Sequence, residues 1–306
     1  MPLPKTISYY LRSVLSTDLP SLIRRRLRNG RYRRQLGFIR KLAPLPVPAT
    51  TSDNVSIHLL TSHYEWQAAL WSARSLLISL GRPLPVVVHD DGSLCKEAIE
   101  AMQKTLPGLT VLTRDKADAL AEKALASFPE CRLVREQSVM GLKLLDPWLM
   151  GNDDVILIDS DVLWFSPPPE LKTWLAGPRD CNYWNEDINS SYSVDPAQIK
   201  AQFNVTMEPR VNCGLGFVAR ASIDLPALES FLVQERPARK PWLVEQTAYA
   251  YLSSRYGVKL LPPTYAVGTA AGKPPVSRLI AKHYVGSIRN DFYLEGLPFL
   301  SRRWLS

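Results

Sequence analysis

The order of hydrophobic and polar positions divides the chain near residue 55. Beyond it, short apolar runs alternate with longer stretches in which apolar residues recur at helical spacing. The runs predicted as strands are residues 55–62, 84–94 with its DDGS turn, 109–114 and 154–165. The stretches predicted as helices are residues 64–81, 95–106 and 135–150, the last with a Pro interruption. This alternation indicates an α/β domain with a mostly parallel central sheet flanked by helices.

Several predicted strands end in polar side chains. These polar ends are Thr61-Ser62-His63, Asp90-Asp91 and Asp159-Ser160-Asp161. In parallel sheets ligands bind beyond the carboxyl ends of the strands, so the pattern predicts a site there. No GxGxxG or GxxxxGK[ST] motif follows any of these strands, and neither a dinucleotide-binding site nor a P-loop is therefore expected.

Asp159 and Asp161 follow the apolar run Val-Ile-Leu-Ile. Alternate residues of an extended chain face the same side, so both carboxylates can reach one small cation. Mg²⁺ and Mn²⁺ prefer oxygen ligands and often share them with substrate phosphates. Two aspartates at a strand end also occur as a solvated turn, but the apolar run places this pair at the mouth of a core strand and favours the metal site.

The segment around Asp159 and Asp161 resembles the metal-binding DxD segment of GT-A glycosyltransferases, which use nucleotide-diphosphate sugars. Four further segments follow the order found in the retaining glycosyltransferase family 8, over roughly residues 55–295. They are GLKLLDPWL, VNCGLGF, VEQTAYAYL and HYVGSIR. The resemblance departs from the family pattern at Thr61, where an Asp is common, and at Arg289-Asn-Asp, where Lys-Pro-Trp usually stands.

The resemblance implies a GT-A fold and roles for individual residues. It implies a metal site for Mn²⁺ or Mg²⁺ at Asp159, Asp161 and His283, and catalytic roles near the donor sugar for Glu245 and Gln246. The residues expected to bind the donor are Thr61, Asp90, Asp91, Lys143, Ser160, Asn212, Gly214, Gly286 and Arg289. UDP-sugars are the favoured donors, whereas the sugar, the linkage and the stereochemical outcome stay open.

Simpler interpretations exist for several of these residues. His283 is also explained as a packed histidine, and Arg289 as a surface charge. Lys143 is also explained as the polar side of an amphipathic helix, and an acid such as Glu245 is favoured in a first helical turn by the helix dipole alone. Asp-Gly sequences such as Asp91-Gly are common in turns. The polar and aromatic residues 181–205 suit a sugar acceptor or a plain surface loop equally.

Composition adds a basic arm to this picture. Of the chain's 306 residues, residues 1–41 carry eleven Lys and Arg and one Asp, and so account for more than the whole net charge of +8. We expect residues 1–50 to form a basic helical extension with a proline-rich linker, and residues 51–306 the catalytic domain. The arm suits an anionic membrane face, and it is also explained as a solvated or partner-packed extension. Nothing resembles a base-reading module, so no nucleic-acid partner is expected.

The remaining bulk features fit a cytoplasmic protein that is peripheral on the inner face of the membrane. No run of about eighteen apolar residues predicts a span. The four cysteines lie far apart, which indicates neither a zinc site nor a disulfide framework.

The sequence therefore predicts a metal-dependent glycosyltransferase. It would move a sugar from a nucleotide diphosphate to a glycan or lipid-linked glycan acceptor, in bacterial surface polysaccharide synthesis. One alternative is a haloacid-dehalogenase-like phosphatase with Asp159 as nucleophile. Another is a glycan- or membrane-binding module without catalysis.

Overall fold

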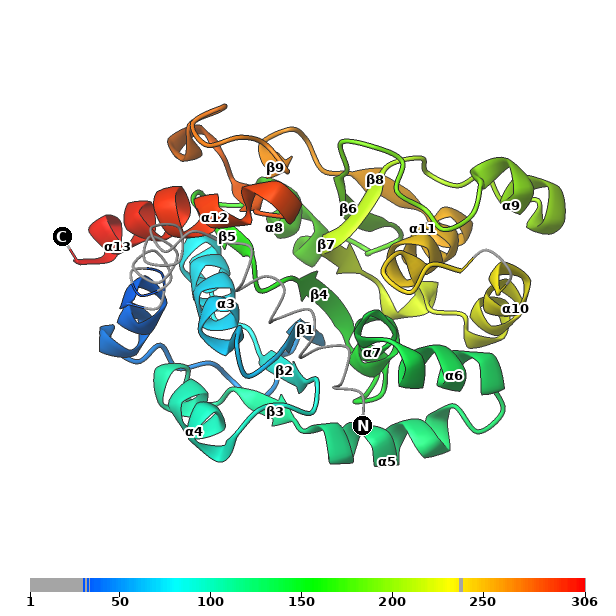
Figure 1. Cartoon of the computed structure of the whole chain (residues 1–306), viewed down its shortest axis with the longest axis horizontal. Coiled ribbons are helices and arrows are strands. Elements are labelled where there is room, and N and C mark those ends of the chain that lie inside the picture. The colour runs from blue at the N-terminus through cyan, green and yellow to red at the C-terminus, as the bar shows by residue number, and fades with distance from the viewer. Residues whose placement is uncertain (1–29, 31, 33, 237–238, 306) are drawn as a thin grey trace, which may run out of the picture.

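The central sheet follows the strand and helix order expected from the sequence. The computed structural model describes residues 30, 32, 34–236 and 239–305 (Figure 1). The sheet has seven strands in the order β3-β2-β1-β4-β7-β6-β8. Its strands are β1 (Val55–Thr61), β2 (Val86–Asp90), β3 (Thr110–Leu112), β4 (Asp154–Ile158), β6 (Asn182–Glu186), β7 (Val211–Val218) and β8 (Val258–Leu260).

Most strand pairs of this sheet are parallel, as predicted. Strand β1 pairs in parallel with β2 and β4, β2 pairs in parallel with β3, and β6 with β8. The exception is β7, which runs antiparallel to both β4 and β6. The carboxyl ends of β1, β2 and β4 therefore meet at one edge, where the sequence places its polar residues.

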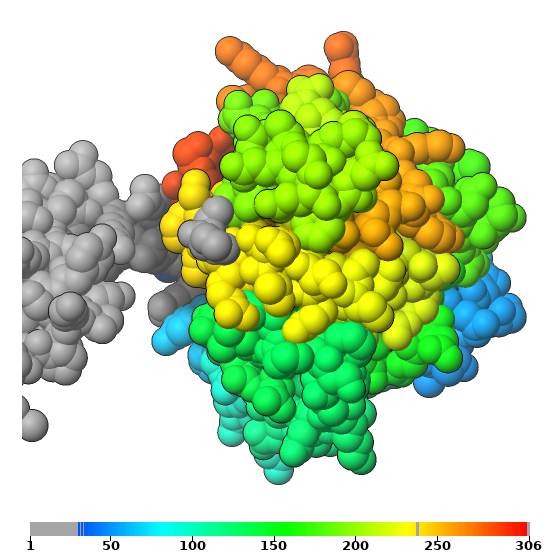
Figure 2. Space-filling view, turned by 90° about the vertical axis from the view of Figure 1, so that its right-hand side faces the viewer, coloured from blue at the N-terminus to red at the C-terminus, as the bar shows by residue number. Residues whose placement is uncertain are grey.

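Helices cover both faces of the sheet. The longer helices are α3 (Trp66–Leu80), α4 (Lys96–Thr105), α5 (Arg114–Ala124), α6 (Pro129–Gln137), α7 (Val139–Leu145), α8 (Pro169–Ala176), α9 (Pro196–Phe203), α10 (Leu225–Glu235), α11 (Val244–Tyr256) and α13 (Leu297–Leu305). Alternate residues of β4 point to opposite faces of the sheet. Ile156 and Ile158 belong to the hydrophobic core that includes α3 and α13. Val155 and Leu157 belong to the core on the other face, which includes α6, α7, α10 and α11. The segments from α6 to α11 form the side seen in Figure 2.

The remaining elements are short. They are the turns η1 (Phe38–Lys41), η2 (Asp146–Trp148), η3 (Arg220–Ser222), η4 (Val276–Arg278), η5 (Gly286–Ile288) and η6 (Phe292–Gly296), with α12 (Arg289–Asp291). A second sheet consists of β5 (Val162–Trp164), β10 (Ala281–His283) and β9 (Tyr265–Val267), in the order β5-β10-β9.

The predicted single strand over residues 154–165 is two strands in two sheets. Strand β4 ends at Ile158 and β5 begins at Val162, with a turn between them in which the N–H of Val162 donates to the carbonyl of Asp159 at 3.2 Å. Both halves are buried and apolar, so periodicity alone did not reveal the break. The aspartate pair thus lies in the turn that connects the two sheets.

The described part of the N-terminal segment packs against the α/β domain. Leu36, Ile39 and Val47 belong to the same hydrophobic core as α3 and α4. The Nε1 of Trp71 donates to the carbonyl of Leu36 at 3.1 Å. The helical pieces predicted for residues 1–29 lie outside the described residues. Within the described residues, none of the helices is long and apolar enough to cross a membrane.

Candidate active site

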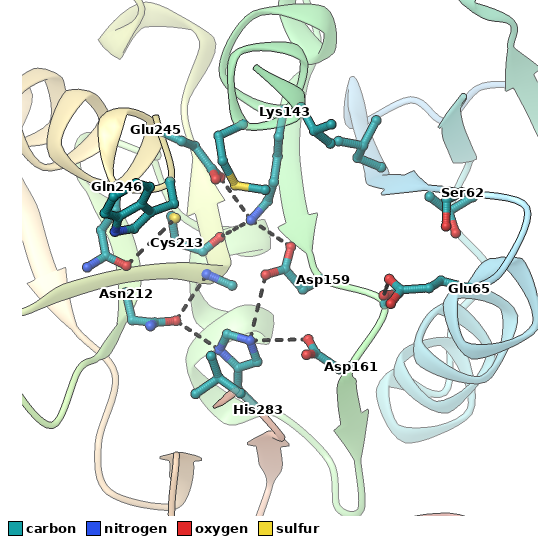
Figure 3. Close-up of a pocket in the computed structure, with 18 of the residues that line it drawn as sticks. Ser62, Glu65, Lys143, Asp159, Asp161, Asn212, Cys213, Glu245, Gln246 and His283 are labelled. Carbon is teal, nitrogen blue, oxygen red and sulfur yellow. Dashed lines mark hydrogen bonds and ion pairs between the residues drawn. The ribbon is translucent and has the colours of Figure 1, made fainter. Parts of the chain in front are cut away.

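The side chains predicted to bind a metal meet beyond the end of β4. The Nε2 of His283 lies 3.2 Å from Oδ1 of Asp161 and 3.6 Å from Oδ2 of Asp159. One ligand atom from each residue lies within 4.8 Å of the others (Figure 3). The fold therefore brings two carboxylates and one imidazole together from distant parts of the sequence.

Strand pairing positions His283 beside the aspartates. Strand β10 runs antiparallel to β5 and places His283 opposite Val162, the residue after Asp161. The N–H of Tyr284 donates to the carbonyl of Asp161 at 3.0 Å, and the N–H of Asp159 donates to the carbonyl of Gly214 at 2.8 Å. Backbone hydrogen bonds from three segments thus set the geometry of the cluster.

Electrostatic attraction within the cluster opposes burial. Burial by itself raises the pKa of a carboxyl group, but His283 and Arg289 hold the pKa of Asp161 below its usual value. Burial by itself lowers the pKa of an imidazole, but Asp161 and Asp159 raise the pKa of His283. Without a cation the cluster therefore favours a proton on the imidazole, and a bound cation would take over that positive charge.

The cluster fits a small divalent cation. Carboxylate oxygens suit Mg²⁺ and Mn²⁺, and an imidazole completes a mixed site for Mn²⁺. The His283 ring is only 4% exposed, and its Nδ1 is 2.9 Å from Oδ1 of Asn212, so its Nε2 is the nitrogen that faces the carboxylates. The cluster lines a pocket of 480 Å³, which leaves room for a ligand beside a metal.

Asn212 and Gly214 shape the space around the imidazole. Asn212 contacts the ring directly, as described above. A Cβ atom added at Gly214 would lie 2.1 Å from Cε1 of His283, far inside van der Waals contact. The ring of His283 therefore occupies space that any side chain at position 214 would fill.

Lys143 lies behind the cluster with its ammonium fully engaged. Its Nζ is 2.6 Å from Oδ1 of Asp159, 2.8 Å from Oε1 of Glu245 and 3.1 Å from the carbonyl oxygen of Cys213. Burial by itself lowers a lysine pKa, but the two carboxylates raise the pKa of Lys143 well above its usual value. An ammonium has three hydrogens, and these three acceptors use all of them. In this structure Lys143 therefore neutralises the charge of the two carboxylates inside the protein.

Glu245 and Gln246 lie in the first turn of α11, where Glu245 reaches Lys143 at the base of the pocket. Burial, against the pull of Lys143, raises the pKa of Glu245 to about 7. The Nε2 of Gln246 donates to the carbonyl of Ser191 at 2.9 Å and to Oδ2 of Asp187 at 3.3 Å. Both residues line the same pocket as the aspartates and His283.

Arg289 lies at the mouth of the pocket, between Glu65 and Asp161. Its Nη2 donates to Oε1 of Glu65 at 2.5 Å, and its Nε is 3.7 Å from Oδ2 of Asp161. The hydroxyl of Ser160 donates to the other oxygen of Glu65 at 3.0 Å. Gly286, which precedes this segment, has a φ of +62°, a backbone conformation that favours glycine. Arg289 is nearly half exposed and is therefore placed where a phosphate could replace Glu65.

The predicted nucleotide contacts separate into two groups. Thr61 and Asp91 line the pocket beyond β1 and β2. Asp90 instead accepts hydrogen bonds from the N–H groups of Gly92 at 2.9 Å and Leu94 at 3.0 Å, and it is outside the pocket lining. In this structure the Asp90 carboxylate therefore stabilises the turn after β2.

The sequence did not single out several residues at the pocket, among them Glu65, Asp187 and Trp242. Glu65 and Trp242 line the pocket, and Asp187 contacts Gln246. Asp187 lies in the segment 181–205, where the little periodicity gave no reason to single out one acid. A residue type that is common at surfaces gives no local signal until the fold shows its neighbours.

Comparison with known proteins identifies the fold. No family model matches the sequence, and no curated protein matches it. The bifunctional glycosyltransferase WbbM superposes with a TM-score of 0.50 at 13% identity, over 82% of this chain and 52% of that one. Mouse xyloside xylosyltransferase 1 superposes with a TM-score of 0.49 at 13% identity, over 79% of this chain and 98% of that one. The galactosyltransferase LgtC superposes with a TM-score of 0.47 at 13% identity, over 76% of this chain and 87% of that one. The likeness to WbbM, of which the chain spans about half the length, confirms the predicted fold: the chain has the GT-A fold of glycosyltransferases.

Proposed function

We propose that this protein is a metal-dependent glycosyltransferase that transfers a sugar from a nucleotide diphosphate, with UDP favoured, to a glycan or lipid-linked glycan. The observation that supports this most strongly is the cluster of Asp159, Asp161 and His283 at the carboxyl ends of the central strands of a GT-A fold. Such a fold and such a cluster together suit a donor whose leaving group is a diphosphate.

The residues of the cluster would hold Mn²⁺ or Mg²⁺, which stabilises negative charge on a departing diphosphate. Arg289 supplies a second positive group at the pocket mouth, where its guanidinium can pair with a phosphate in place of Glu65. Lys143 keeps Asp159 and Glu245 close together without net repulsion. Lys143 thus neutralises carboxylates inside the protein, and Arg289 neutralises phosphate charge at the mouth of the pocket.

The side of the pocket formed by the start of α11 suits the reacting sugars. Glu245 and Gln246 lie there, and burial raises the pKa of Glu245 to about 7. Trp242, Val139 and Val285 add exposed apolar surface at the same pocket. The Trp242 side chain is 69% exposed, and indole rings stack on the apolar faces of sugars. We assign this surface to the acceptor.

The basic residues of positions 1–41 support an acceptor at an anionic membrane surface, as a lipid-linked glycan of bacterial surface polysaccharide synthesis would be. This location is peripheral, on the cytoplasmic face. The GT-A fold gives the phosphatase alternative no structural support.

Thermal unfolding with Mn²⁺, with UDP and with both tests the proposal. We expect UDP and Mn²⁺ together to raise Tm by more than the sum of their separate effects, because the diphosphate completes the metal coordination. The Asp161→Asn variant should lose this synergy, whereas Asp115→Asn, which alters an exposed acid on α5, should keep it. A wild type without synergy, and without metal-dependent hydrolysis of any nucleotide sugar in a panel, would favour a non-catalytic module.

A further inference from the structure

Asp187 connects the metal cluster to the predicted catalytic wall. It follows β6 directly, and its Oδ2 accepts hydrogen bonds from Nδ2 of Asn212 at 3.0 Å and from Nε2 of Gln246 at 3.3 Å. Asn212 contacts the metal-ligating His283, and Gln246 faces the pocket (Figure 3). One carboxylate oxygen therefore holds two amide side chains that serve different parts of the site.

The hydrogen bonds of Asn212 determine which nitrogen of His283 carries a hydrogen. The backbone N–H of Gly214 donates to Oδ1 of Asn212 at 3.1 Å, so this atom is the amide oxygen, and the amide nitrogen faces Asp187. The Nδ1 of His283 lies 2.9 Å from the same oxygen. Because an amide oxygen only accepts, Nδ1 must donate. In the neutral imidazole Nε2 then has a free lone pair, and that nitrogen faces Asp161.

The hydrogen bonds of Gln246 are equally restrictive. Its Nε2 donates to Asp187 and to the carbonyl of Ser191, which uses both amide hydrogens. The remaining polar atom is Oε1, which lies 3.9 Å from Sγ of Cys213. Gln246 therefore has only an acceptor available for a bound sugar.

The position of Asp187 comes from an irregularity between β6 and β7. The pairing of these strands shifts register between Trp184 and Asn185, which moves the end of β6 relative to β7. The N–H of Asp187 then donates to the carbonyl of Arg210 at 2.8 Å and fixes its backbone. Such irregularities often aim a side chain at a site. A carboxylate suits this position because it has no hydrogen to offer and accepts from both amides.

We propose that Asp187 is a positioning residue that holds Asn212 so that the Nδ1–H of His283 points at Asn212, the Nε2 of His283 faces the metal site and the Oε1 of Gln246 faces the substrate. Its effect on metal binding rests on the proposed function. Its effect on the imidazole tautomer is a property of the metal-free protein and is independent of that function.

The tautomer can be read directly from the ¹⁵N chemical shifts of the histidine side chains. The chain has four histidines, and a His283→Gln variant assigns the signal of interest. At a pH at which this imidazole is neutral, the metal-free wild type should show one tautomer with the hydrogen on Nδ1. Asp187→Leu should show a mixture of both tautomers, since the Asn212 amide is no longer held.

The affinity for Mn²⁺, measured by titration calorimetry, gives the second measurement. Loss of the direct hydrogen-bond partner of a metal ligand typically costs 10–100-fold in affinity. Asp187 acts one step further out, through Asn212, so we expect a loss of about tenfold, at the low end of this range, for Asp187→Leu. Asp187→Asn removes the charge but keeps an acceptor oxygen, so it should stay close to wild type in tautomer and affinity. Glu186→Gln removes the neighbouring charge, which pairs with Arg210, and should change neither property.

Two results would overturn the proposal, provided that circular dichroism shows Asp187→Leu to be folded. One is a wild-type tautomer and Mn²⁺ affinity in Asp187→Leu. The other is an equal change in Asp187→Asn and Asp187→Leu, which would mean that Asp187 acts by its charge alone. A wild type that binds no Mn²⁺ would overturn the proposed metal site and its dependence on Asp187, while the tautomer would still decide the positioning role.

Discussion

Lys143 and Glu245 form a buried ion pair at the base of the pocket, with 2.8 Å between Nζ and Oε1. The same ammonium contacts Asp159, so it separates two carboxylates that would otherwise face each other without a counter-charge. The stability of the fold and the geometry of the site therefore depend on one lysine.

Replacement of this lysine by Lys143→Met should destabilise the protein by about 3 kcal/mol, because an unpaired buried carboxylate remains. Urea unfolding measures the change. Lys143→Met combined with Glu245→Gln should recover part of the loss, since the second substitution removes the unpaired charge. Equal free energies of unfolding for the single and double variants would show that the pair does not couple.

Substitution of Gly214 should damage metal binding without unfolding the protein. In Gly214→Ala the new methyl group overlaps the His283 ring, which must move away from the aspartates. We expect the affinity for Mn²⁺ to fall by about tenfold or more, as for other losses of ligand orientation. Gly37→Ala is the matched control, because a Cβ there meets no atom within 4 Å. An unchanged affinity in Gly214→Ala would contradict the role given to this glycine.

A second pair of histidines should make the protein sensitive to acid. Nδ1 of His58 lies 2.8 Å from Nε2 of His89 inside the domain. Burial lowers the pKa of His89 from 6.5 to about 3, with a further contribution from Arg135, and burial and His89 lower the pKa of His58 well below 6.5. Both rings are therefore neutral in the folded protein at pH values at which the unfolded chain takes up protons.

The sign of this effect follows from proton uptake. Because the unfolded state binds more protons below pH 6.5, the stabilisation is present above that pH and is lost as the pH falls toward 3. Between pH 7 and pH 5 the free energy of unfolding should fall by about 2 kcal/mol through His89, and His58 should add to the fall in the same direction. Urea unfolding at several pH values measures how the free energy of unfolding changes with pH. This pH dependence should be less steep in His89→Gln, and the exposed control His63→Gln should keep the wild-type pH dependence. A wild-type pH dependence in His89→Gln would contradict the prediction.

The exposed indole of Trp242 should affect the acceptor and leave the donor unaffected. If it stacks on the acceptor sugar, Trp242→Ala should raise the acceptor KM about tenfold, because the sugar loses a large apolar contact surface. Metal-dependent hydrolysis of the donor, measured without acceptor, should be unchanged. Leu294→Ala, an exposed apolar residue outside the pocket lining, is the control. A matching loss in donor hydrolysis would place Trp242 at the donor instead.

The sequence predicted the α/β architecture because apolar periodicity distinguishes buried strands from amphipathic helices locally. It also predicted the edge of the sheet at which the site lies, since polar residues follow the apolar runs there. The metal-site interpretation of Asp159 and Asp161 needed only their spacing and the preceding run. His283 joined them through the family resemblance.

Other features depend on contacts between distant segments. The break between β4 and β5 is absent from the periodicity, since each strand is buried in a different sheet. The engagement of Lys143 by two carboxylates and a carbonyl was also absent from the local pattern, while its predicted contact with the donor stays a prediction. These properties follow from where strands and helices meet, which no local pattern encodes.

By itself, then, the sequence determined the class of fold and the position of the aspartate pair, because both follow from local spacing and residue identity, whereas His283 was identified through the resemblance. Only the tertiary structure decided that Asp187 supports Asn212 and Gln246, and that Glu65 pairs with Arg289. A hydrogen bond needs two groups within about 3 Å, and for residues far apart in the chain that distance is set by sheet pairing and helix packing.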